Sequence, residues 1–358
     1  MKNRVFILFY LGILLFSTPS LGADYEHPLY LSVRSLALGN AVVSSVHDEQ
    51  SLFLNPAGLA RVKDLQFTLG SLAAEGSQQL VYHSGEIKTA NNSFGIDTLN
   101  QLVGKNNFGK IQATSTLAIL GFGIGVIADG EISSRLVNQV SPTGELGALG
   151  TYGVQVGYGF KIAQFKKSRG RVDLGIATKF LSRGGRMQVP PLSAIVGLNK
   201  DVLLGDVKSL GSGIGMDSGL QMSYALDGQL EFLSGVVFSD MGYTSFSNKA
   251  PRISPFLAAG VGLRMKRRDL TATLTYDYQR ITESIDWRKK NHFGLELKFP
   301  IVSLYGGLNG LLIPTFGFGV NLSWIQLLVA STGQELGTTV GQNTERRIAA
   351  QAQLKFDF

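Results

Sequence analysis

Segments of about ten residues in which apolar and polar side chains alternate constrain this chain more than any other sequence feature. Side chains of a β-strand point to opposite faces in turn, so each segment has one apolar and one mixed face. The mixed faces carry Lys179, Asp277, Glu296 and Lys298, which a polar lumen accepts and the interior of a β-sandwich does not. The alternation is clearest in Val172–Phe180, Leu270–Tyr278 and Phe293–Phe299. The sequence therefore predicts an all-β fold, a transmembrane antiparallel β-barrel.

The last strand-like segment alternates up to the end of the chain. Ile348, Leu354, Phe356 and Phe358 share its apolar face, and Lys355 lies on the other face. A terminal phenylalanine on an apolar strand face resembles the signal by which bacterial outer-membrane proteins are recognised for insertion. We therefore expect Phe356 and Phe358 to act as an insertion signal, with the barrel assembly machinery and outer-membrane lipids as partners.

The N-terminus indicates export. Lys2 and Arg4 precede Val5–Phe16, a stretch without any charge, and small residues follow up to Ala23. This is the layout of a secretory signal peptide, whereas a membrane-spanning helix needs about 20 apolar residues. We expect residues 1–23 to be removed and the mature chain to reside in the bacterial cell outer membrane.

Counting connections back from Phe358 gives about fourteen strands, with short turns on the periplasmic side and long loops outside. In this count the first strand starts near Ser77, and the strand-like segment Leu65–Ala73 is left over. Either this segment belongs to a plug, or the count contains an error. The expected outer loops include Ile87–Phe108, Gly130–Leu149, Gly184–Gly213 and Met241–Arg252.

Glycines recur at every second position in several of these segments. The runs are Gly121, Gly123 and Gly125; Gly157 and Gly159; Gly211, Gly213 and Gly215; and Gly317 and Gly319. They make room in the lumen for a plug, or they relieve crowding and permit strands to bend. The second interpretation is the favoured expectation.

The sequence contains no recognisable catalytic or metal-binding pattern. The four histidines, His27, His47, His83 and His292, do not have metal-ligand spacing, and the chain contains no cysteine. The formal charge of +7 comes from scattered Lys and Arg, without a basic helix or aromatic–basic module. We therefore expect no enzyme, no cofactor, no metal and no nucleic-acid partner.

The segment between the signal peptide and the barrel is too polar for a barrel strand and too apolar for a free tail. Pro56 disfavours helix at Asn55, and Gly58 permits a sharp bend. A compact turn held against the barrel fits this pattern, and a lumen of this width needs filling or conducts water. We therefore predict three parts: signal peptide 1–23, N-terminal hatch 24–63 and barrel 64–358.

This segment resembles the N-terminal signature of the FadL-like outer-membrane superfamily. The residues that carry the resemblance are Arg34-Ser35, Gly39-x-Ala41, Asp48 and Asn55-Pro56-Ala57-Gly58-Leu59-Ala60. The C-terminal half is similar to the PorV-like branch at Gly213-x-Gly215-x-Asp217-x-Gly219-Leu220, Gln334-Glu335-Leu336-Gly337, Arg346-Arg347 and the terminal Phe. His47 and Asn40 depart from the pattern, standing where an acidic residue and a glycine are usual.

The resemblance implies a small hatch inside the barrel, with Asn55, Pro56, Ala57, Gly58 and Asp48 as hatch or gating residues. Its first functional implication is passive transport of a hydrophobic small molecule, such as a long-chain fatty acid, across the outer membrane. The alternative is a PorV-like protein that binds or shuttles secreted proteins, with loop Gly184–Gly213 as the docking surface. A general porin or structural barrel is the third possibility.

Overall fold

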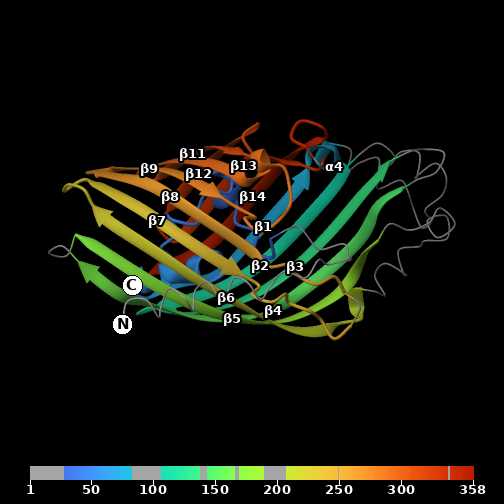
Figure 1. Ribbon diagram of the computed structural model, residues 1–358, viewed down its shortest axis with the longest axis horizontal. Helices are drawn as coiled ribbons and strands as arrows, with labels where there is room; N and C mark the ends of the chain where they lie inside the picture. The colour runs from blue at the N-terminus through green and yellow to red at the C-terminus, as the bar shows by residue number, and fades with distance from the viewer. Residues whose placement is uncertain are drawn as a thin grey trace.

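A closed antiparallel barrel of fourteen strands forms the molecule (Figure 1). The computed structural model describes residues 28–82, 106–137, 143–165, 169–188, 207–248, 250–337 and 339–358, so the predicted signal peptide lies outside the described residues. Each strand pairs with its sequence neighbours, and β1 pairs with β14 to close the barrel. The strands are β1 (Gln66–Ser77), β2 (Asn106–Ile119), β3 (Phe122–Val137), β4 (Thr143–Phe165), β5 (Gly170–Gln188), β6 (Gly211–Ala225), β7 (Leu230–Ser239), β8 (Phe256–Arg267), β9 (Leu270–Tyr278), β10 (Asn291–Lys298), β11 (Val302–Asn309), β12 (Ile313–Leu322), β13 (Ile325–Glu335) and β14 (Thr344–Asp357).

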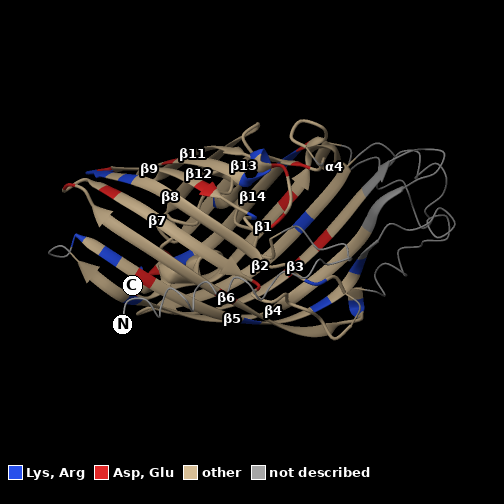
Figure 2. Ribbon diagram, in the orientation of Figure 1, with Lys and Arg blue, Asp and Glu red and all other residues tan. Residues whose placement is uncertain are grey.

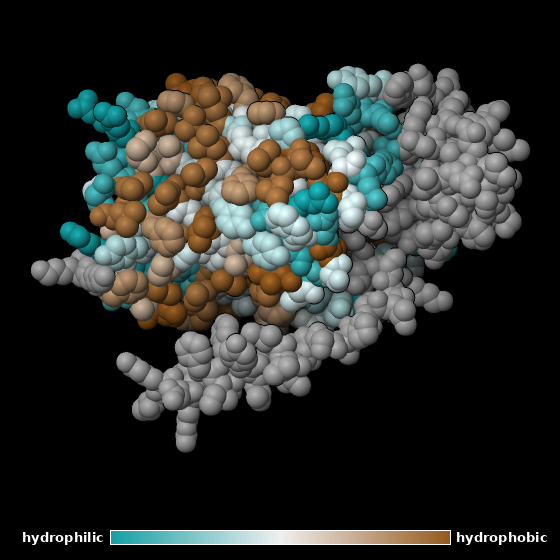
Figure 3. Space-filling model, turned by 45° about the horizontal axis from the view of Figure 1, so that its top comes forward, coloured by the Kyte–Doolittle hydropathy of each residue, from teal (hydrophilic) through white to brown (hydrophobic). Residues whose placement is uncertain are grey.

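The predicted alternation is confirmed on both faces of the wall. Large apolar side chains such as Leu72, Ile111 and Ile176 are exposed on the outside, as a lipid-facing surface requires, and they cover much of the exterior in Figure 3. Lys179 and Asp277 point inward and are buried. Lysine and arginine also occur at the left-hand strand ends in Figure 2, where the short turns lie. Within the described residues, no helix is both long and apolar enough to cross a membrane.

The first strand was misplaced by the count from sequence. Strand β1 begins at Gln66, not near Ser77, and it contains the segment left over from that count. A bulge between Thr68 and Gly70 shifts the pairing register on both neighbouring strands. The outward positions therefore change from odd to even numbers after Leu69, and this interruption hides the strand from a period-two pattern.

The outer ends of β3, β4 and β5 extend further than expected. The pairing of Val137 with Thr143 carries the β3–β4 ladder through most of the expected loop Gly130–Leu149. Strand β4 has 23 residues, whereas β10 and β11 have 8 each. The barrel is consequently taller on the β3–β5 side, as Figure 1 shows. Pro190-Pro191 in the expected docking loop Gly184–Gly213 lies outside the described residues.

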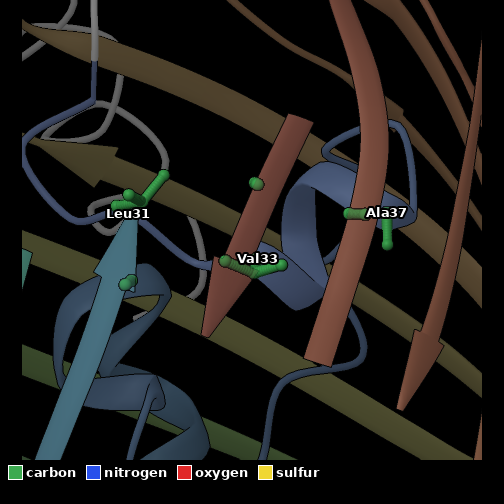
Figure 4. Close-up of a cluster of buried hydrophobic side chains, with 6 residues drawn as sticks. Leu31, Val33 and Ala37 are labelled. Atoms are coloured by element: carbon green, nitrogen blue, oxygen red, sulfur yellow. The ribbon is translucent and has the colours of Figure 1, made fainter. Parts of the chain in front are cut away.

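The N-terminal segment lies inside the barrel, as predicted for a hatch. It consists of α2 (Val33–Ala37), α3 (Ser51–Leu54) and the 3-10 helix η1 (Pro56–Arg61). Helix α2 contacts β11–β14, and η1 contacts β3–β6, so the hatch spans the lumen. Figure 4 shows Leu31, Val33 and Ala37 between the strands; they form a buried cluster with Ala73, Ala330 and Ala349 of the wall. Outside the hatch, the described elements include the short helices α4 (Gln78–Tyr82) and η2 (Trp287–Lys290).

The closing strand brings aromatic rings together beside the seam. Phe356 stacks on Phe67 of β1 and on Phe358, with ring centroids 6.5 and 6.3 Å apart. The Phe358 amide donates to the carbonyl oxygen of Leu65 at 2.9 Å, while its ring stays 74% exposed. The expected insertion-signal residues thus lie at the short-turn rim, on the outer face.

Candidate functional site

Asn55 connects the two halves of the hatch. Its side chain is fully buried, and its amide nitrogen donates to the carbonyl oxygens of Val43 at 2.9 Å and of Val236 on β7 at 3.4 Å. Its carbonyl oxygen accepts from the Ala57 amide at 3.2 Å, which caps η1. Pro56 stands at the first helical position, where its fixed φ and missing N–H suit the turn. The side chain therefore fixes η1 against both the remaining hatch and the wall.

Gly58 is required by the close packing of the hatch. A Cβ at this position would lie 2.5 Å from the carbonyl oxygen of Val46 and would overlap the Ser51 hydroxyl. Ala57 is fully buried beside it. The Asn55–Gly58 motif is thus a turn that leaves no room for a side chain at Gly58.

Polar side chains of the wall bind the hatch backbone around the lumen. Gln221 donates to the carbonyl oxygens of both Val43 and Val46 at 3.0 Å, and Asp277 accepts from the Val43 amide at 2.9 Å. Further wall donors reach other hatch carbonyls: Lys110 to Pro28, Gln112 to Leu29, Gln155 to Leu52, Thr275 to Ala41, Gln279 to Asn40 and Thr315 to Ala37. These glutamines and threonines were not predicted as hatch contacts. Their only signal was a polar side chain at an inward position.

Wall glycines provide the room for the hatch, which corrects the favoured expectation that they serve bending. A Cβ on Gly175 would overlap Pro56, and one on Gly219 would overlap the Asn55 side chain. A Cβ on Gly125 or Gly157 would lie 2.7 or 2.8 Å from hatch side chains. Alternating glycines on one strand face therefore mark where another segment crosses that face at backbone distance.

Ion pairs join the hatch to the wall near the short-turn rim. Arg34 binds Glu296 through two hydrogen bonds of 2.9 and 2.7 Å, and Lys355 contacts Glu49 at 2.8 Å. A third pair joins Arg61 to Asp173 at 3.0 Å. Among the lumen charges predicted from sequence, Glu296 and Asp277 thus bind the hatch, whereas Lys298 is exposed.

His47 and Asp48 form a turn on the hatch. The His47 ring nitrogen Nδ1 lies 2.8 Å from the carbonyl oxygen of Ser45, and the residue borders open space within the barrel while the wall encloses it on all sides. Burial by the surrounding protein, followed by the nearby Arg264 guanidinium, lowers the pKa of His47 to about 4. For Asp48, burial opposes ionisation, but Lys355 and Arg34 outweigh it and lower its pKa. The described residues contain no group of three side chains suited to a metal ion.

A second segment missed by the sequence analysis enters the lumen from the opposite rim. The described residues 241–248 and 250–253 between β7 and β8, called the inner loop below, lie against β6. The sequence placed this segment outside as loop Met241–Arg252. The signal for its inward course was the run Gly211, Gly213 and Gly215, each of which faces the inner loop.

Comparison with known proteins gives matches only among solved structures, since no protein-family model and no curated protein matches the sequence. A deltaS2S3 mutant of the monoaromatic hydrocarbon channel TodX superposes with a TM-score of 0.54 at 12% identity, covering 92% of this chain and 99% of that chain. A TodX deltaS2 mutant gives 0.53 at 12% identity, covering 93% and 100%. The Ralstonia pickettii toluene transporter TbuX gives 0.51 at 11% identity, also covering 93% and 100%.

The sequence identity is below 25% in all three superpositions, so they show a shared fold. In this chain that fold is a closed barrel of fourteen strands around an N-terminal region of short helices. The resemblance seen in the sequence is thereby confirmed for the fold. The chain thus has the fold of these hydrocarbon-channel structures, a closed barrel with its N-terminal segment in the lumen.

Proposed function

We propose that this protein is an outer-membrane channel for passive uptake of uncharged hydrophobic small molecules. The observation that carries the proposal is the hatch, which fills the lumen and is held by hydrogen bonds from the wall. A general porin needs an open water path, whereas a hatch with an apolar core suits intermittent passage of an apolar molecule. The named neighbours, a monoaromatic hydrocarbon channel and a toluene transporter, support the same ligand class.

Charge pairing inside the barrel favours uncharged ligands over long-chain fatty acids. Lys110 lies 3.6 Å from Asp129, Lys179 lies 3.0 Å from Asp217, and Arg347 lies 3.3 Å from Glu75. These cations are already neutralised, so a ligand carboxylate would have to displace a buried partner. An uncharged aromatic molecule avoids that cost.

In this proposal, the other parts of the chain have roles in export, membrane insertion and gating. Residues 1–23 direct export, the barrel 64–358 inserts into the outer membrane with Phe356 and Phe358 recognised by the assembly machinery, and residues 24–63 form the hatch. The ligand enters from the outside, passes beside a shifted hatch and leaves on the periplasmic side. No catalytic step is involved, and Asn55 and Asp48 act as gating residues.

Uptake by whole cells tests the proposal. A bacterial host without its own hydrocarbon channel would express the protein, and initial uptake of naphthalene and of oleate would be compared. We expect faster naphthalene uptake than in cells with empty vector, and little change for oleate. Preferential oleate uptake would instead support a fatty-acid channel, and a retained protein in native mass spectrometry without any small-molecule adduct would support secretion or tethering.

Asn55→Ala tests the gating role. Loss of buried hydrogen bonds costs about 1–3 kcal/mol, so the hatch should loosen and naphthalene uptake should change severalfold. The matched control is Asn321→Ala, because the Asn321 amide binds Ser303 beside a short turn. If Asn55→Ala and deletion of the hatch both leave uptake unchanged, the gating role is wrong.

A further inference from the structure

Helix α4 lies on the outer face of the wall, beside the strands that close the barrel. A Cβ on Gly109 of β2 would lie 2.9 Å from the Leu80 side chain, and one on Gly76 of β1 would lie 3.3 Å from Val81. Both glycines stand between inward, buried neighbours, so they occupy outward positions of their strands. Figure 1 shows α4 at the end of the barrel that carries the long loops. After β1 the chain therefore turns onto the lipid-facing side of the barrel.

Small side chains line a hollow of about 800 Å³ in the outer face, next to α4 and on its membrane side. Ala74, the next outward position of β1 after Gly76, belongs to the floor of this hollow. The exposed side chains of Leu327 and Val329 form its border on β13. The alanines of the floor, which come from β1, β2, β3 and β14, are Ala74, Ala113, Ala128, Ala350 and Ala352.

The wall behind the hollow is continuous. Strand pairing crosses the floor without interruption through Val329, Ala350, Ala74, Ile111 and Gly130. A Cβ on Gly130 would meet no atom within 4 Å, so the hollow is open toward the outside there. It is thus a depression in the lipid-facing surface and not a passage into the lumen. Its occupant must come from the membrane.

The position of α4 favours a flexible chain over a second barrel as this occupant. A helix with its side chains is about 10–12 Å across, and α4 stands off the wall by about this width. The wall of another barrel would meet α4 before it touched the alanine floor. An acyl chain is narrow enough to lie beside the helix, and by filling the hollow it restores the dispersion contacts that an empty space would forfeit.

Two exposed side chains place the upper end of the hollow at the level of lipid headgroups. Tyr82 at the end of α4 is 68% exposed, as expected of the aromatic girdle at the membrane interface. Arg346 is exposed on β14, two outward positions above Ala350, which is about 13 Å along the strand. It donates to the carbonyl oxygen of Pro314 on β12 at 2.6 Å, so its side chain crosses β13 on the outer face.

The Arg346 guanidinium has the donor geometry for a phosphate group. It carries five N–H donors, of which the bond to Pro314 uses one. Arginine binds phosphate through two parallel hydrogen bonds, and this pairing is stronger than that between neutral groups. An anionic headgroup above the apolar hollow therefore matches both the charge and the chain-binding surface.

We propose that this outer-face site binds one phosphate-bearing lipid of the outer leaflet, with an acyl chain in the alanine hollow beside α4 and a phosphate at Arg346. The long-loop rim faces outside in barrels of this kind, so the lipid belongs to the outer leaflet. Its chemistry is that of lipopolysaccharide, a phosphorylated glycolipid with several acyl chains. The bound lipid lies across β13, β14, β1, β2 and β3, and it therefore braces the seam at which the barrel closes. The site is independent of what passes through the lumen.

Native mass spectrometry of the intact protein, purified from outer membranes and supplied with rough-type lipopolysaccharide, tests the hollow. We expect the wild type to retain one lipid, and the double variant Ala113→Phe with Ala350→Phe, whose rings fill the hollow, to retain at least tenfold less. The matched control is Ala259→Phe at an outward position of β8, seven strands from β1, which should retain as much as the wild type. Equal retention by the double variant would overturn the site. A wild-type dimer without lipid, abolished in the double variant, would assign this face to a second copy and also overturn it.

Arg346→Gln tests the headgroup contact and leaves the floor of the hollow unchanged. The wild type should retain phosphorylated lipopolysaccharide at least fivefold better than the dephosphorylated lipid, and Arg346→Gln should lose this preference. Arg267→Gln, an exposed arginine at the short-turn rim, is the control and should keep the preference. Equal retention of both lipids by the wild type would overturn the phosphate contact.

Discussion

In the lumen, the identity of several residues is dictated by how closely the hatch approaches the wall strands. Asn55 has its amide between two hatch segments and the wall, and it can fit only because Gly219 presents no side chain there. Gly175 allows the same approach for Pro56. Hatch and wall residues therefore form complementary pairs, in which a change on one side affects the other.

Gly219→Ala should loosen the hatch although it alters only the wall. The added methyl group overlaps the Asn55 carbonyl oxygen, and overpacking of this kind costs about 1–3 kcal/mol. Hydrogen exchange of the hatch amides, followed by mass spectrometry, should become about tenfold faster or more. The matched control is Gly130→Ala on β3, where a Cβ meets open space. Equal exchange in both variants would contradict the complementary-pair account.

Acidification should weaken the hatch through His47. The pKa of His47 is about 4 in the folded protein, against 6.5 for the free side chain, so below pH 6.5 the unfolded state binds the proton more readily. Stability should therefore decrease as the pH falls from 6.5 to about 4 and then level off for this group. The melting temperature of the detergent-solubilised protein measures it. His47→Asn should flatten this part of the curve, and an unchanged curve would show that other groups dominate.

At the scale of elements, strands could be predicted from the sequence wherever the alternation of apolar and polar residues is uninterrupted. The inward placement of Asp277 and Glu296 follows from alternation alone. The count of fourteen agrees with the structure although its first strand was placed near Ser77, where β1 ends and α4 follows. The first strand was missed because the bulge after Thr68 changes the phase of the pattern. Strands β3 and β4 were predicted too short, because beyond the membrane a strand needs no apolar outer face and its sequence then looks like a loop.

The site was only partly predictable for a related reason. The Asn55–Gly58 motif could be found because it lies within one short segment. Gln221 and the inner loop could not, because their contacts join residues far apart in the chain. Gln221 was indicated in the sequence only by its polar side chain at an inward position, and the inner loop only by the glycine spacing, which has two physical explanations.

Phe358→Ala should reduce assembly of the last strand. The ring is 74% exposed on the outer face and stacks on Phe356 next to the seam, so its loss removes a recognition surface and leaves the interior unchanged. The folded fraction in outer membranes, measured by heat-modifiable migration on gels, should fall severalfold. Phe316→Ala is the control, since that ring is also exposed, at 62%, on β12. A similar fall in both variants would mean that general lipid contact, not recognition, is responsible.

At the scale of the whole molecule, the barrel is filled from both rims. The hatch crosses the lumen near the short turns, and the inner loop covers it from the other side. The wall contributes the polar groups that hold both segments. Under the proposed function, a ligand would therefore have to pass two packed segments in turn.

Removing the hatch should convert the protein into a pore. A signal-bearing variant that lacks residues 28–63 retains all fourteen strands, and a lumen of this width conducts water and ions. In planar bilayers we expect small, rare currents from the wild type and a steady conductance at least tenfold larger from the variant. Steady conductance of the wild type itself would favour the general-porin alternative.

The short connection between hatch and barrel sets how far the hatch can travel. Only Val62 to Leu65 separate the end of η1 at Arg61 from the start of β1 at Gln66. Four extended residues reach about 14 Å at most, and Val62 is itself buried. The C-terminal end of the hatch therefore stays within this distance of the start of β1 at the short-turn rim. Under the proposed function, a ligand would pass beside a hatch that remains attached at this rim, and the space left beside the hatch would limit the size of the ligand.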